Sequence, residues 1–185
     1  MNEFPRTEVG GVSLSRMIIG SNWFLGWSHT TAAKDKYITT HVKDSKKIAD
    51  IMEVFVNSGV DTTMGLIQVP EFYEAIQETQ QRTGRKIIVV STPYIPATPE
   101  TATKGFDLGE VERILDLEVK AGATFCMPHT SITDVMLDKC TREIRHMEPV
   151  IKMIRDRGMH PGFSTHVPET IIYADENNMD IDSYI

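Results

Sequence analysis

Two histidines and one aspartate stand at or near the ends of apolar runs, where their side chains could take part in chemistry. The aspartate is Asp61, and the histidines are His129 and His166. Two imidazoles and one carboxylate can bind Zn²⁺ or Fe²⁺ and leave coordination positions open for water and substrate. These residues suggest a metal-dependent hydrolase, lyase or isomerase as one candidate function, and no dense motif such as His-Glu-x-x-His accompanies them.

The elements that would position these side chains are short apolar runs, each followed by a segment with helical periodicity. The runs cover residues 17–22, 60–63, 87–92, 124–129 and 161–166. Continuous apolar runs are typical of strands covered on both faces, and alternation of strand and helix predicts a parallel sheet. The carboxyl ends of parallel strands lie along one edge, where catalytic and binding residues gather.

Apolar spacing of three and four residues predicts the helices between these strands. They are expected over residues 45–58, 71–83, 108–121, 131–139, 141–157 and a short stretch from Pro168. Val9-Gly-Gly-Val12 predicts a β-hairpin within residues 1–15. A complete eight-unit barrel needs about 250 residues. We therefore expect one partial domain over residues 1–185: an incomplete (β/α)8 TIM barrel of the α/β class, with the hairpin followed by about five βα units in residues 16–185.

Composition limits the functions that this chain could have. The formal net charge is −7, and the Lys and Arg residues form no block that would bind nucleic acid. No apolar stretch is long enough to cross a membrane. Cys126 and Cys140 form no disulfide framework. These features predict a cytoplasmic protein whose partner is a small-molecule substrate.

Four segments carry a resemblance to a known family. They are Gly10–Gly20, Ser58–Gly65, Met127-Pro-His129 and Gly162–Thr165, and they occur in the order expected for the aldo/keto reductase superfamily, which this chain resembles through its whole length. The resemblance implies a (β/α)8 barrel that binds NADPH and reduces carbonyl groups by hydride transfer. On this hypothesis the chain is an NAD(P)H-dependent oxidoreductase.

The resemblance also implies site residues. The catalytic Asp of the family corresponds to Asp61 and its substrate-orienting His to His129, whereas its Tyr corresponds to Leu66 and its Lys to Thr92. Tyr94 is the candidate for supplying the phenol that Leu66 lacks, because carbonyl reduction needs a proton or a positive charge at the oxygen. The cofactor-binding residues would be Gly20, Ser21, Asn22, Ser164 and Thr165.

Two further possibilities follow from the same residues. Loss of the family's Tyr and Lys is compatible with a non-catalytic relative that binds a small molecule without turnover. An open barrel would also leave edge strands and apolar surface exposed, which favours self-association or completion of the barrel by a C-terminal segment absent from this sequence.

Overall fold

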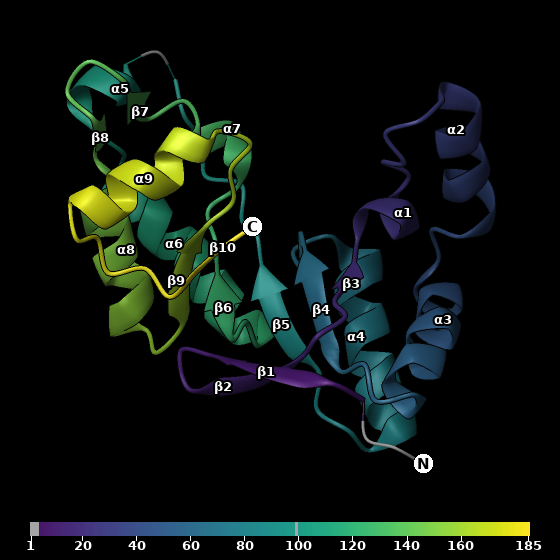
Figure 1. The fold of residues 1–185 in the computed structure, drawn as a ribbon. Helices are drawn as coiled ribbons and strands as arrows, with labels where there is room; N and C mark the ends of the chain where they lie inside the picture. The colour runs from purple at the N-terminus through teal and green to yellow at the C-terminus, as the bar shows by residue number, and fades with distance from the viewer. Residues whose placement is uncertain (1–3, 99) are drawn as a thin grey trace. The chain divides into compact units, whose positions relative to one another are not determined.

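The computed structural model describes residues 4–98 and 100–185, which fold as two compact units (Figure 1). One unit extends to Val90 and the other from Ser91 to Ile185. Whether they act as the single partial domain expected from the sequence stays a prediction. No helix in the described ranges is long and apolar enough to cross a membrane.

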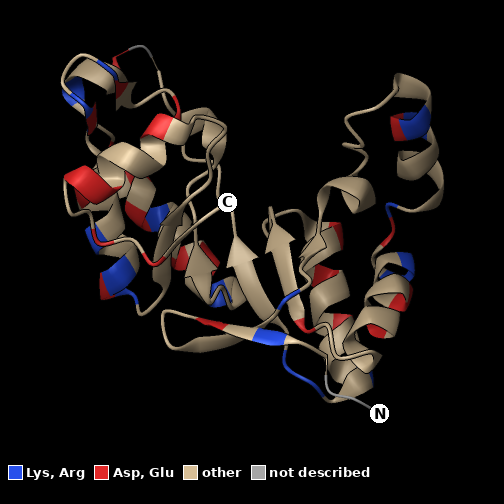
Figure 2. Cartoon of the chain, viewed as in Figure 1, with Lys and Arg blue, Asp and Glu red and all other residues tan. Residues whose placement is uncertain are grey.

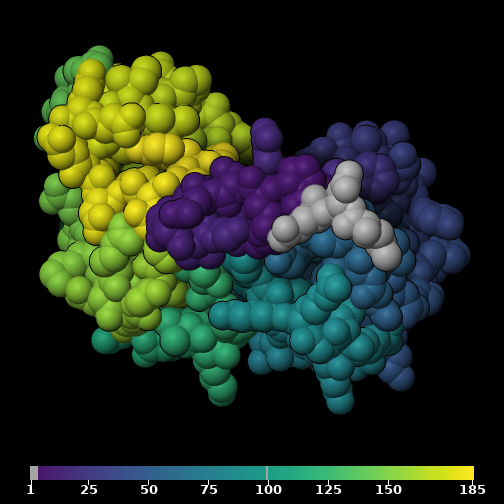
Figure 3. All heavy atoms as spheres, turned by 60° about the horizontal axis from the view of Figure 1, so that its bottom comes forward, coloured from purple at the N-terminus to yellow at the C-terminus, as the bar shows by residue number. Residues whose placement is uncertain are grey.

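The first unit begins with the expected hairpin and continues as alternating strands and helices. Its elements are β1 (Arg6–Val9), β2 (Val12–Ser15), β3 (Ile19–Gly20), α1 (Asn22–Leu25), α2 (Ala32–His41), α3 (Ser45–Asn57), β4 (Thr62–Gly65) and α4 (Pro70–Thr83), followed by β5 (Ile88–Ser91), which ends at the boundary. β1 and β2 pair antiparallel with Val9 opposite Val12. The predicted hairpin is confirmed, and its surface is seen in purple in Figure 3.

Local sequence explains why α3 and α4 form where they do. The Asp44 carboxylate caps α3 by accepting hydrogen bonds from the amides of Lys46 and Lys47. Gly84 ends α4 in the left-handed conformation that glycine adopts readily. The two helices pack against each other through buried apolar stripes. The stripes are Ile48, Ala49, Met52 and Val56 on α3, and Phe72, Ala75, Ile76 and Thr79 on α4.

The second unit contains the remaining elements. They are α5 (Thr101–Lys104), α6 (Leu108–Ala121), β6 (Phe125–Cys126), α7 (Thr130–Thr133), β7 (Leu137–Asp138), β8 (Glu143–Ile144), α8 (Met147–Asp156), β9 (His160–Phe163), α9 (Pro168–Glu176) and β10 (Ser183–Tyr184). The structure corrects the helix expected over 131–139, because α7 ends at Thr133 and an antiparallel β7–β8 hairpin follows. It also moves the start of the next helix from residue 141 to Met147.

One strand order, β10-β9-β6-β5-β4-β3, defines the sheet. The pairs β3–β4, β6–β9 and β9–β10 are parallel. Helices alternate with these strands along the chain, so the predicted fold class, an incomplete TIM barrel of the α/β class, is confirmed. β10 is the sixth strand of this sheet, and it was not predicted from the sequence.

The core of the second unit lies where α6 and α8 contact each other and the strands β6 and β9. Leu115 of α6, Val150 of α8 and Phe163 of β9 are fully buried within it. Cys126 is buried in the same cluster, and this burial raises the pKa of its thiol. A buried thiol with a raised pKa is a poor nucleophile, so Cys126 is a core residue.

Ion pairs hold the segment that leads into β10. Arg155 of α8 donates from Nη1 to Asp182 Oδ2 at 2.7 Å and from Nη2 to Asp180 Oδ1 at 2.7 Å. His160 Nδ1 lies 2.6 Å from the same Asp182 oxygen. The hydrogen bond from Arg155 is the main cause that lowers the pKa of Asp182 from its ordinary value of 3.8.

We expect the replacement Asp182→Asn to lower stability at neutral pH and to matter less in acid. A carboxyl group whose pKa is lower in the folded state stabilises the fold above its ordinary pKa. That contribution is lost as the pH falls through the lower, folded-state pKa. Urea midpoints at pH 7 and at progressively lower pH would measure the difference. Asp156→Asn, which changes an exposed carboxylate on α8, is the control, and an equal deficit at every pH would contradict the expectation.

Candidate functional site

The second unit places two of the predicted residues side by side. β6 and β9 are adjacent parallel strands, and each is followed at its carboxyl end by two residues and then a histidine, His129 or His166. The Ser164 amide donates to the Pro128 carbonyl at 3.3 Å, which ties together the loops after β6 and β9. His129 is half-buried and His166 is exposed. Both imidazoles therefore stand on the edge of the sheet where sequence analysis placed a site.

Backbone hydrogen bonds fix the loop that carries His129. The Met127 amide donates to the Ser91 carbonyl at 2.8 Å, and the His129 amide donates to the Pro93 carbonyl at 3.1 Å. Ser91 is the last residue of β5, so the His129 loop is held along the end of the neighbouring strand. Pro128 restricts the backbone between these two contacts. His129 is thus attached to rigid structure.

The hydrogen bonds of His129 determine where its ring carries a proton. Nδ1 accepts from the Ser131 amide at 3.2 Å and lies 2.8 Å from Ser131 Oγ. Because an amide N–H can only donate, Nδ1 is unprotonated and a neutral His129 carries its proton on Nε2. Burial, followed by the nearby charge of His166, lowers the pKa of His129 from its ordinary 6.5. Near pH 7 the ring is therefore neutral and presents an Nε2–H donor.

Asp134 lies against the same two loops and was missed by sequence analysis. Its carboxylate accepts hydrogen bonds from the hydroxyls of Thr130 and Thr165 and from the His166 amide. Burial acts to raise the pKa of Asp134, but these hydrogen bonds and the charge of His166 outweigh it and lower the pKa. Asp134 is consequently ionised at neutral pH.

Asp61 lies elsewhere in the fold from where the family resemblance implied. β4 begins at Thr62, so Asp61 precedes the strand and stands at its amino end. Its Oδ2 accepts from Arg6 Nη1 at 2.9 Å, and the Ser15 amide donates to Thr62 Oγ1 at 3.2 Å. Both contacts attach the β1–β2 hairpin to the start of β4. This placement gives Asp61 a structural role, and its catalytic role is left without support from the geometry.

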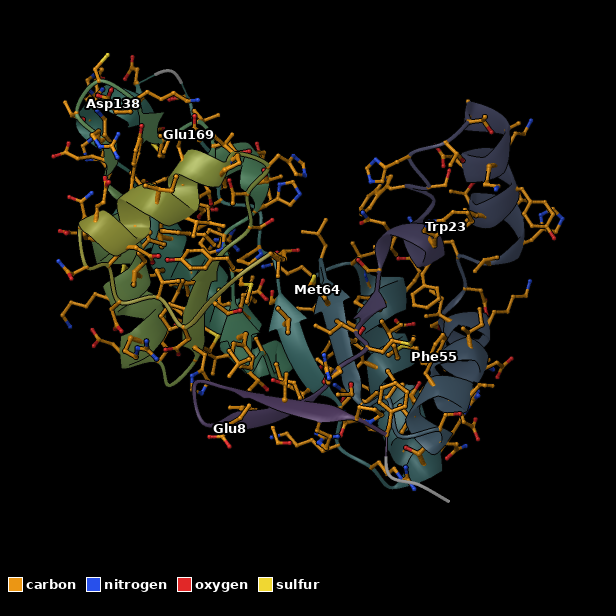
Figure 4. All side chains as sticks on the ribbon, in the orientation of Figure 1. Glu8, Trp23, Phe55, Met64, Asp138 and Glu169 are labelled. Atoms are coloured by element: carbon orange, nitrogen blue, oxygen red, sulfur yellow. The ribbon has the colours of Figure 1, made fainter. Side chains whose placement is uncertain are left out.

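The remaining predicted residues fall into two places. Gly20, Ser21 and Asn22 lie at the carboxyl end of β3, where the Ser21 amide donates to the Met64 carbonyl at 3.0 Å. Asn22 Nδ2 lies 3.1 Å from His29 Nε2. Figure 4 shows Trp23 on α1 and Met64 near the end of β4. This group belongs to the first unit.

Tyr94, Ser164 and Thr165 belong to the second unit. Tyr94 follows β5 and is 56% exposed, and its hydroxyl makes no hydrogen bond within the described part of the chain. Ser164 and Thr165 form the loop between β9 and His166. The Thr165 hydroxyl donates to Asp134 at 2.5 Å, so its hydrogen is already used within the protein.

The predicted metal ligands are not gathered into one site. Within residues 4–98 and 100–185, no three His, Cys, Asp or Glu side chains are grouped so that they could hold a metal ion. Asp61 is paired with Arg6, and the nitrogen of His129 that lacks a proton already accepts from Ser131. The residues present therefore do not fit Zn²⁺ or Fe²⁺ as the sequence analysis combined them.

Comparisons with known proteins support the fold and overturn the family. No protein-family model and no curated protein matches this chain. Solved structures do match. One is the Y628A variant of the carboxyl transferase domain of Rhizobium etli pyruvate carboxylase with pyruvate (TM-score 0.53, 14% identity), and another is the same domain without that substitution, with 3-bromopyruvate (TM-score 0.52, 15% identity). Each alignment covers 76% of this chain, and it covers 24% of the first neighbour and 23% of the second.

The resemblance to aldo/keto reductases was wrong. The two structures described above are carboxyl transferase domains and not reductases, so the NADPH cofactor and the carbonyl reductase function are corrected with it. The NADPH-binding roles of Gly20, Ser21, Asn22, Ser164 and Thr165 and the hydride-transfer roles of Asp61, His129 and Tyr94 lose the support of that resemblance. Asp61 and His129 were also selected because they stand near the ends of apolar runs, and a site role for these residues stays a prediction. At this level of identity the comparisons establish the fold, and the site must be argued from its own geometry.

Proposed function

We propose that this chain forms part of a TIM-barrel enzyme of the lyase, isomerase or transferase type that acts on a small 2-oxo acid or related carboxylate. The observation that carries the proposal is the hydrogen bond from the Ser131 amide to His129 Nδ1, which leaves Nε2 as the donor of a neutral ring beside His166 at the carboxyl ends of β6 and β9. This edge is where active sites of TIM barrels lie. The pyruvate in the matching structures supports the choice of substrate class.

The donor on His129 suits a reaction that develops negative charge on a substrate oxygen. A fixed N–H group directed at an enolate or carboxylate oxygen stabilises that charge without reorganising during the reaction. A neutral imidazole can perform this task, as in triosephosphate isomerase, where a neutral histidine polarises the substrate carbonyl. Here the Ser131 amide and partial burial keep His129 in the required form.

His166 supplies a second imidazole next to the first. It is exposed, and its ring has no hydrogen-bond partner among the residues that the structure describes. Imidazole is the side chain most often used for proton transfer near neutral pH. We assign His166 one of two roles: it binds the substrate carboxylate, or it transfers a proton to or from the substrate.

The proposal can be tested by binding of pyruvate and of oxalate to the full chain. We expect either anion to shift the imidazole NMR signals of His129 and His166. His129→Gln should weaken binding about 10- to 100-fold, the range that corresponds to a hydrogen bond to a charged group. The matched control is His41→Gln, which changes an exposed histidine on α2 and should leave the affinity unchanged. Calorimetry measures these affinities.

Two results would overturn the proposal. One is the absence of any change in the His129 and His166 signals at millimolar pyruvate and oxalate. The other is stoichiometric Zn or Fe in the purified chain that is lost on His166→Ala, which would instead support the metal-dependent alternative. Such a metal would need ligands beyond those grouped in the described part of the chain.

Completion of the sheet by further strands is part of the proposal. β3 and β10 are the two ends of the strand order, and the chain spans about a quarter of the length of the neighbours. An unpaired strand readily pairs with another segment, unless charged side chains on it oppose the pairing. Figure 2 shows that most charged residues lie on the helices and loops and few on the strands. We propose that additional βα units pair with β10.

A further inference from the structure

We infer that Asp134 is a positioning residue that holds the loops of His129 and His166 in register and keeps a negative charge beside both imidazoles. The inference deepens the proposed function, because it concerns the same site. It also stands on contacts that exist whether or not a substrate binds. Asp134 is not among the residues predicted to form a site, and it lies within the helix expected over residues 131–139.

The geometry shows how one carboxylate joins the two loops. Asp134 Oδ2 accepts from Thr130 Oγ1 at 2.7 Å and from the His166 amide at 3.1 Å. Asp134 Oδ1 accepts from Thr165 Oγ1 at 2.5 Å. Thr130 directly follows His129 in the chain, and Thr165 directly precedes His166. His129 is therefore connected to Asp134 through the hydrogen bond of its neighbour Thr130. His166 is connected through the hydrogen bonds of its neighbour Thr165 and of its own amide.

Thr165 extends this connection to the start of α9. Its Oγ1 accepts from the Val167 amide at 3.0 Å and lies 3.0 Å from Thr170 Oγ1. Asp134 accepts the one proton that the Thr165 hydroxyl can donate, so the direction of these hydrogen bonds is set by the carboxylate. Removing the carboxylate would leave the His166 amide without its acceptor, and the Thr165 hydroxyl would donate instead to Thr170 Oγ1 or to the Val167 carbonyl.

The charge of Asp134 acts on the imidazoles as well. The lowered pKa of Asp134 keeps it ionised at neutral pH, and its charge acts to raise the pKa of His129. This effect opposes burial and the charge of His166, which both lower the pKa of His129. The ionisable groups that contribute to these two pKa shifts are His129, Asp134 and His166. Asp134 thus limits how far the His129 pKa falls.

A purely structural role for Asp134 leads to a different expectation. A carboxylate that only holds the two loops together would affect stability and leave the titration of His129 unchanged. The replacement Asp134→Asn separates the two roles, because the amide oxygen can still accept from Thr130 and the His166 amide while the charge is lost. Asp134→Ala removes both the acceptor and the charge.

The test is the pH titration of ¹⁵N-labelled histidines in the full chain, followed by NMR. In Asp134→Asn we expect the midpoint of His129 to move to lower pH, while the signals keep the tautomer with the proton on Nε2. The matched control is Asp138→Asn, which changes a carboxylate that accepts from the Cys140 amide in the β7–β8 hairpin. The control should leave the titration of His129 unchanged.

The same variants extend the test to binding. A polar group left without its hydrogen-bond partner typically costs about 10- to 100-fold in an equilibrium constant, so Asp134→Ala should weaken oxalate binding in that range and Asp134→Asn less. If Asp134→Ala does not fold, Asp134→Asn carries the comparison. Unchanged His129 titration in a folded Asp134→Asn would overturn the inference. The titration needs no ligand, so failure of oxalate to bind would contradict the proposed function and leave the titration result standing.

Discussion

Replacing Phe163 with alanine is expected to lower the free energy of unfolding of the second unit by about 3–5 kcal/mol. Phe163 is the last residue of β9, and its side chain is 0% exposed. It packs in the core cluster with Leu115, Ile132 and Ile151. Truncation removes the transfer free energy of the ring and leaves a cavity that a packed interior closes only in part.

Urea unfolding followed by circular dichroism would measure this loss. The control is Leu117→Ala on α6, a position that is 41% exposed, where we expect a change below about 1 kcal/mol. Since Phe163 immediately precedes the Ser164–His166 loop, the variant should also weaken oxalate binding under conditions where it remains folded. A stability loss no larger than that of Leu117→Ala would show that the core is packed differently from the structure.

The parts of the fold that sequence analysis found are those with several local signals in agreement. α6 combines an apolar stripe with a capping aspartate and a closing glycine: the Asp107 carboxylate accepts from the Gly109 and Glu110 amides, and Gly122 ends the helix in the left-handed conformation. The structure gives the helix the predicted bounds, Leu108–Ala121. α9 starts at Pro168 as expected, because proline is favoured in the first helical turn.

The prediction failed where apolar spacing was the one signal available. Ile132, Val135 and Met136 have helical spacing, but α7 stops at Thr133. Asp138 then accepts from the Cys140 amide and organises the turn of the β7–β8 hairpin. Spacing alone does not distinguish a short helix followed by a hairpin from one longer helix. β10 was missed because two residues carry no detectable period.

The site shows the same division between local and non-local information. His129 and His166 were identified because each closes an apolar run, and strand ends can be read from sequence. Asp134 was not, because its partners Thr165 and His166 come from a distant loop. Asp61 was misplaced because the strand is formed by Thr62–Gly65, which lie after it rather than before it.

Replacing Gly65 with alanine is expected to lower the free energy of unfolding by about 2–4 kcal/mol, and Gly84→Ala serves as its control. Gly65 ends β4 with φ of +148°, and a Cβ there would overlap the Ser21 side chain, which is buried at the end of β3. Gly84 has φ of +65°, but a Cβ there meets nothing within 4 Å, so its replacement costs the backbone strain alone, about 1–2 kcal/mol. The difference between the two variants, measured by urea unfolding, reports the cost of the Cβ overlap with Ser21 together with the extra backbone strain of alanine at φ +148°. Equal losses would mean that Ser21 yields without cost, and that the close approach of these two strand ends does not depend on glycine.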